Sequence, residues 1–103
     1  MSETETFESL TRRFDSPAPM PPRERWEIGK RAERLAEELG DKRALYEIRM
    51  RLVGFAFQAA QATEQLTLFL WCAHMHDSDP SRYPVRPLET QPDVDLLWWY
   101  KWL

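Results

Sequence analysis

The chain has 103 residues, enough for one small domain with a modest core and little room for a large cofactor cavity. Its 14 basic and 17 acidic residues give a formal net charge of −3, and the two signs are interleaved along the chain. This composition offers no basic surface, so we expect neither nucleic acid nor an anionic membrane as a partner. A 43% hydrophobic share with five tryptophans favours a folded globular chain.

Cysteine usage and the hydrophobic pattern favour a cytoplasmic protein. The single cysteine, Cys72, excludes an intramolecular disulfide, and the opening residues MSETETFES lack the basic start and apolar stretch of a secretory leader. The longest nearly uncharged segment, residues 52–75, carries glutamine, threonine and glutamate near its centre. It therefore predicts two helices joined by a polar turn and no membrane-spanning helix.

Residues 1–14 predict a short amphipathic helix. Ser2 and Glu5 have the spacing of a capping box, and apolar residues recur at helical intervals at Phe7, Leu10 and Phe14. Residues 15–22 contain four prolines, which forbid a helix and predict an extended linker. We therefore expect a semi-detached N-terminal arm, which could dock on the rest of the chain as an internal blocker of its binding groove.

Residues 23–103 predict an all-α domain of antiparallel helical hairpins. A long helix is expected from Pro22 to the glycine stop at Gly40, with one face made of Trp26, Gly29, Ala32, Leu35, Ala36 and Leu39. A second helix is expected from about Asp41 to Gln61, with a stripe of Leu45, Ile48, Leu52, Phe55, Ala56 and Ala59. A neighbouring apolar stripe predicts that this second helix is sandwiched between others; it comprises Tyr46, Met50, Val53 and Phe57.

A third helix is expected after Thr63, whose hydroxyl would cap it, with an apolar face of Leu66, Phe69, Leu70 and Ala73. A loop of roughly fifteen residues with four prolines follows, which is long for a connection. Asp93 or Asp95 would then cap a fourth helix, DLLWWYKWL.

Two of these helices repeat the same apolar pattern at a constant offset of 34 residues, from Ala32 to Leu66 and from Ala36 to Leu70. The stretch from about residue 25 to residue 103 resembles the tetratricopeptide repeat class of helix-turn-helix solenoids. AERLAEELGD is similar to the second helix of one repeat, ALYEIRMRLVGFAFQ to the first helix of the next, and EQLTLFLWCAHMHDSDP to its partner. The packing positions of the repeat are matched by Leu52, Ala56, Phe69 and Cys72, with Pro80 near the usual terminating proline. Val53 and Gln65 depart from the pattern, which has glycine or alanine at the first position and alanine at the second.

The resemblance implies a scaffold that binds a protein or peptide without catalysis, cofactor or metal. Such scaffolds usually bind through a concave surface lined by the first helix of each repeat. Here that surface would be formed by Tyr46, Arg49, Met50, Val53 and Phe57. The alternative interpretation, which is at least as well supported, is that these side chains pack against adjacent helices. Because few positions dominate a real interface, only a minority of the five would be contact residues.

Two sets of residues could carry chemistry. His74, His76, Asp77 and Asp79 resemble a metal site, but histidines two apart on a helix point to different faces, so a role at the helix C-terminus is favoured. Cys72 and His76 are four apart and could touch, which leaves open a small helical enzyme subunit with a thiol nucleophile. The alternative is that Cys72 is a small buried hydrophobe. Acidic residues such as Glu33 and Glu37 are expected on solvated helix faces.

The C-terminal turn is expected to be part of an interface. Its indoles, Trp98, Trp99 and Trp102, would form an apolar patch larger than monomers usually expose. They could pack on the chain's own helices, form the seam of a homodimer, or meet the next helix of a longer solenoid. We favour the longer solenoid, because this end lacks a polar capping element.

Overall fold

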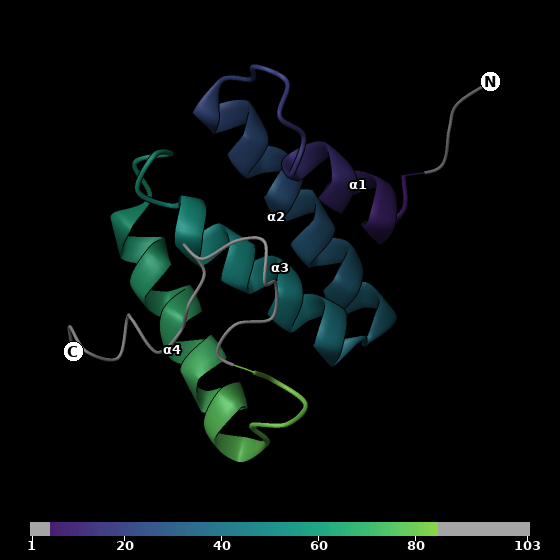
Figure 1. Ribbon diagram of the computed structural model, residues 1–103, viewed down its shortest axis with the longest axis vertical. Coiled ribbons are helices and arrows are strands. Elements are labelled where there is room, and N and C mark those ends of the chain that lie inside the picture. The colour runs from purple at the N-terminus through teal and green to yellow at the C-terminus, as the bar shows by residue number, and fades with distance from the viewer. Residues whose placement is uncertain (1–4, 85–103) are drawn as a thin grey trace.

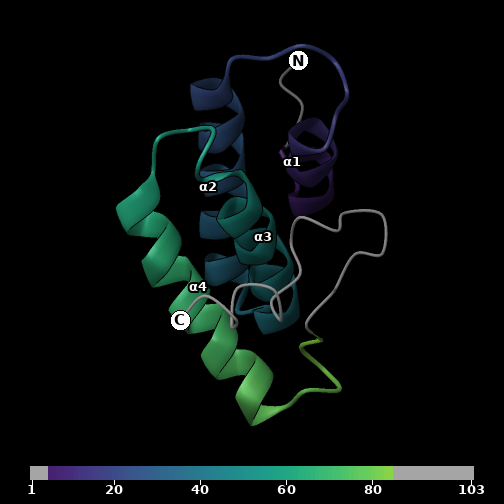
Figure 2. The same ribbon diagram turned by 60° about the vertical axis from the view of Figure 1, so that its left-hand side comes forward.

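The computed structural model describes residues 5–84, and these residues form four helices and no strand (Figure 1). The helices are α1 (Phe7–Phe14), α2 (Pro22–Leu39), α3 (Lys42–Phe55) and α4 (Ala62–Ser78). Successive helices run in roughly opposite directions, and the principal contacts join α1 to α2, α2 to α3 and α3 to α4 (Figures 1 and 2). The expected all-α fold is confirmed at this level.

Local signals set several helix ends as predicted. Proline stands at the start of α2, and Gly40 ends that helix in the left-handed conformation with a φ of 67°, which favours glycine. The carboxylate of Asp41 then caps α3 by accepting a hydrogen bond from the Ala44 amide at 3.0 Å. These residues make a tight reversal between α2 and α3.

The junction between α3 and α4 differs from the prediction. Helix α3 ends at Phe55, about a turn and a half earlier than expected, and Ala60 adopts a positive φ of 58° in the turn that follows. Helix α4 begins at Ala62, so Thr63 lies inside the helix and does not cap it. The side chain of Gln65 donates a hydrogen bond of 2.7 Å to the carbonyl of Val53. It thereby satisfies one of the acceptors that the end of α3 leaves unpaired.

The expectation of a semi-detached arm is wrong, because α1 packs into the common core. Leu10 is 2% exposed and Phe14 is 6% exposed. The ring of Phe14 meets Phe55 of α3 edge to face, with centroids 5.6 Å apart. The capping box of α1 is formed by Thr6 and Ser9, three residues apart, and it does not involve Glu5.

Polar contacts fix α1 and the proline-rich linker in place. The guanidinium of Arg25 donates hydrogen bonds to three carbonyls, that of Phe14 at the end of α1 and those of Ser16 and Ala18 in the linker. Arg51 of α3, 8% exposed, pairs with Asp15 at 3.0 Å. The linker is therefore held against α2. Phe14 and Asp15 meet Phe55 and Arg51, which lie on a different face of α3 from Tyr46 and Met50, so these contacts do not block that face.

The core runs through all four helices and its largest fully buried side chains are Tyr46, Ile28, Ile48, Met50, Leu52, Val53 and Cys72. Gly29 lets the helices approach closely: a Cβ at this position would lie 2.6 Å from Leu52 Cδ2 and 2.9 Å from Phe14 Cε2. Some predicted core positions are instead exposed. Leu39 is 68% exposed, and the buried face of α4 is rotated from the expected one, since it consists of Leu68, Phe69, Cys72 and Ala73.

Candidate functional site

The predicted groove residues on α3 divide into buried and exposed side chains. Tyr46, Met50 and Val53 are fully buried, and the Tyr46 hydroxyl donates a hydrogen bond of 2.6 Å to the Pro84 carbonyl. These three side chains present no accessible groove face in this structure, so the packing interpretation fits them. Phe57, in the turn before α4, is 83% exposed. Among the apolar residues predicted to line the groove, Phe57 alone has a side chain that is accessible to a partner.

Arg49 joins the helices through a network of charges that the sequence did not reveal. Its guanidinium pairs with Glu33 at 2.7 Å and with Glu37 at 3.3 Å, and it lies 4.4 Å from the ring centre of Trp71 on α4. Glu33 is 4% exposed, so the expectation of a solvated side chain is wrong at this position. Because its charge is used inside the fold, Arg49 serves to join α2, α3 and α4.

Lys30 extends this network to α4. Its ammonium lies 2.5 Å from Glu33 and 2.7 Å from Glu64. Burial lowers the pKa of Lys30, but hydrogen bonds and charge attraction from the two carboxylates outweigh burial, and the pKa lies above its usual value of 10.5. Lys30 is therefore held in the charged form, as a structural cation between two helices.

Cys72 and His76 are not arranged as a nucleophile and its base. Cys72 is fully buried, and burial raises the pKa of its thiol to about 12, so the thiolate needed for attack is scarce at neutral pH. The ring Nδ1 of His76 is 2.7 Å from the carbonyl of Tyr83. This geometry fits a structural role for both residues: Cys72 fills the core, and His76 ties the segment after α4 back to the helix.

The histidine and aspartate group at the end of α4 does not gather ligands. Within residues 5–84, no group of three or more histidine, cysteine, aspartate or glutamate side chains could hold a metal ion. His74 is exposed, and the carboxylate of Asp79 accepts hydrogen bonds from Ser81 and from the Arg82 amide. These contacts shape the turn that follows α4.

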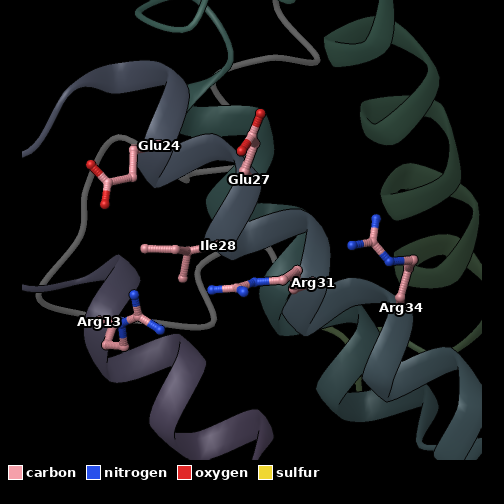
Figure 3. Close-up of a pocket in the computed structure, with 6 residues that line it drawn as sticks. All are labelled: Arg13, Glu24, Glu27, Ile28, Arg31 and Arg34. Atoms are coloured by element: carbon pink, nitrogen blue, oxygen red, sulfur yellow. The ribbon is translucent and has the colours of Figure 1, made fainter. Parts of the chain in front are cut away.

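A charged groove lies between α1 and α2, with a volume of about 390 Å³ (Figure 3). It is lined by Arg13, Glu24, Glu27, Ile28, Arg31 and Arg34. Arg13 and Arg31 face each other across it, and both pair with the carboxylate of Glu5, at 3.5 and 3.2 Å. The lining holds three arginines and two glutamates, and two of the arginines pair with Glu5 beside the groove. With Glu5 included the charges balance, so they favour neither an anionic nor a cationic ligand.

The outer face of α4 carries two apolar side chains that are exposed in the described part of the chain. Leu66 is 52% exposed and Leu70 is 53% exposed, and they lie one helical turn apart. Thr63 and Thr67 flank them on the same face, so four neighbouring exposed positions carry no ionisable group. We call Thr63, Leu66, Thr67 and Leu70 the α4 outer face. The sequence placed both leucines in the core because α4 is apolar around most of its circumference.

The predicted interface residues Trp98, Trp99 and Trp102 lie outside the described residues. Of the helices in the described part of the chain, none has the length and apolar character needed to cross a membrane. Comparison of the chain with protein-family models, curated proteins and solved structures gives no match.

Proposed function

We propose that this protein is a helical protein-interaction scaffold whose docking surface is the α4 outer face, and that the occupant is an amphipathic helix of another protein. The observation that carries the proposal is the half-exposure of Leu66 and Leu70 on a face without charge. Small threonine side chains beside the leucines would let a second helix approach closely. Phe57, in the turn before α4, is a further exposed apolar side chain that a partner reaching past the start of α4 would contact.

The order of packing supports a helix as the occupant. Helices α2 and α3 each have a helix packed on either side, whereas α4 has its principal contacts with α3 alone among the described elements. One more helix laid along α4 would continue the same arrangement. Such neighbour-to-neighbour packing is typical of helical repeat proteins, and together with the resemblance to tetratricopeptide repeats it supports a scaffold of that general kind.

The exposed leucines set the scale of the binding energy. Burying a whole leucine side chain is worth about 1.5–3 kcal/mol, and each of these has roughly half of its surface left to bury. The two together would contribute about 2 kcal/mol to binding, which corresponds to about a thirtyfold change in affinity. They would therefore be the apolar anchors of an interface and not its whole energy.

Site-specific photocrosslinking tests the proposal in cells that make the protein. A photoreactive amino acid replaces Leu70 in one variant and Glu24 in a matched control, because Glu24 is also exposed but lies on α2. We expect a discrete adduct with one other protein at position 70 and not at position 24. The purified partner must then bind the wild-type chain directly.

The other outcomes each point to a different occupant. An adduct between two copies of the chain would replace the proposal by a homodimer, which is one of the alternatives that the aromatic C-terminus leaves open. A link within one chain would mean that the α4 outer face is covered by the protein's own residues. Equal labelling at positions 70 and 24 would contradict the proposed surface.

A further inference from the structure

The start of α1, the end of α2 and the start of α3 lie close together (Figure 1). A second groove lies between them. Its volume is about 310 Å³, and its lining consists of Glu5, Thr6, Phe7, Glu8, Leu35, Leu39, Asp41 and Ala44. It is distinct from the α4 outer face, because no residue of α4 lines it. We call it the acidic groove.

The floor of the acidic groove is apolar. Phe7, Leu35 and Ala44 are partly buried and pack against the core. Leu39, the last residue of α2, is 68% exposed, although leucine usually loses most of its surface in a folded chain. The glycine cap at Gly40 turns the chain away directly after Leu39 and leaves its side chain at the edge of the groove. An apolar side chain from a ligand would therefore find an apolar surface here.

The charged residues that line the acidic groove are all acidic. Its carboxylates belong to Glu5, Glu8 and Asp41, and no lysine or arginine is among the lining residues. Glu5 is already neutralised by Arg13 and Arg31. Glu8 and Asp41 remain, and although each stands at a helix N-terminus, a full carboxylate charge exceeds the half charge of a helix end.

We propose that the acidic groove binds a basic amphipathic segment of a partner protein. One apolar side chain of that segment would insert beside Leu35 and Leu39, while flanking lysine or arginine side chains would pair with Glu8 and Asp41. The combination of an apolar floor and acidic lining residues selects this chemistry, because an acidic peptide would be repelled and an uncharged one would gain only the apolar contact. The inference does not depend on the function of the α4 outer face.

Two synthetic peptides test the proposal against the full chain. Both have a leucine face at helical spacing; one flanks it with lysines and the other with glutamates. Binding is followed by amide chemical shifts in nuclear magnetic resonance. We expect the lysine peptide alone to bind, with the largest shifts at Glu8, Leu39 and Ala44, and with an affinity that falls as salt is added.

Two variants locate the site, and a third is the control. Leu39→Gln is expected to weaken the lysine peptide about tenfold by removing the exposed apolar contact. Glu8→Gln is expected to weaken it about threefold and to reduce the salt dependence. Leu70→Gln, on the α4 outer face, is expected to leave the affinity unchanged. Since Glu8, Leu39 and Leu70 are all exposed, these variants are expected to fold.

The proposal is overturned if neither peptide binds, if both bind equally, or if Leu39→Gln and Leu70→Gln have the same effect.

Discussion

Replacing Glu33 by alanine is expected to destabilise the fold more than any other single loss of an acidic side chain in residues 5–84. Glu33 is 4% exposed and holds two cations, Lys30 at 2.5 Å and Arg49 at 2.7 Å. Its removal leaves both cations partly buried, with side chains 22% and 15% exposed. Each keeps one other carboxylate, Glu64 or Glu37.

These contacts set the expected magnitude. Breaking a fully buried ion pair by deleting one partner costs about 3–5 kcal/mol. Because both cations here retain a second carboxylate and some contact with water, we expect a loss of about 2 kcal/mol in the free energy of unfolding. For a chain of this size that loss lowers the melting temperature by roughly 10 °C.

Urea unfolding followed by far-ultraviolet circular dichroism measures the loss, with Glu37→Ala as the matched control. Glu37 also pairs with Arg49, at 3.3 Å, but its side chain is 52% exposed, so its removal is expected to cost below about 1 kcal/mol. Equal losses for Glu33→Ala and Glu37→Ala would refute the argument that burial makes Glu33 special.

Three further outcomes are expected. Gly29→Ala should lower the free energy of unfolding, measured in urea, by about 1 kcal/mol. Overpacking against Leu52 and Phe14 costs about 1–3 kcal/mol, and the higher helix propensity of alanine offsets roughly 1 kcal/mol of that cost. A variant more stable than the wild type would contradict this prediction. A thiol reagent should label Cys72 far more slowly in the folded chain than in urea, since burial raises its pKa to about 12, and equal rates would argue for an accessible thiolate. The pKa of Lys30 is raised in the folded chain, so its charge stabilises the fold below pH 10.5 and this contribution is lost as the pH rises through the higher folded value. The free energy of unfolding should therefore fall more steeply with pH in the alkaline range for the wild type than for Lys30→Met. Identical pH profiles for the two proteins would contradict this prediction.

The helices could be predicted from the sequence because their ends depend on local chemistry. Pro22, Gly40 and Asp41 each act on the backbone within one turn of their own position. The end of α3 could not be predicted in the same way. Its apolar pattern continues through the turn that follows, and Gln65, twelve residues after Val53, supplies the hydrogen bond that closes the junction.

The buried face of α4 was mispredicted because the helix is apolar on most sides. Leu66 and Leu70 fit a helical stripe as well as Leu68 and Cys72 do, so spacing alone could not decide which pair faces α3. The docking surface we propose contains Leu66 and Leu70, the pair that the fold leaves exposed. Such an exposed uncharged face can be identified only once the side of α4 that packs against α3 is known.

The role of Glu33 was hidden for a related reason. Its spacing from Glu37 is that of two residues on a solvated face, yet the packing of α3 and α4 encloses Glu33 and leaves Glu37 at the edge. Sequence spacing fixes which residues share a face of one helix, and it does not fix how far a neighbouring helix covers that face. Tyr46 and Met50 illustrate the same limit, since the core encloses both.

The most direct test of the docking surface is a calorimetric titration of the partner captured at position 70. The wild-type chain is compared with Leu66→Gln/Leu70→Gln and with Glu24→Gln, which changes an exposed residue of α2. We predict that the double leucine variant binds about thirtyfold more weakly and that the control binds like the wild type. An unchanged affinity for the double leucine variant, or an equal loss in the control, would contradict the assignment of the α4 outer face as the docking surface.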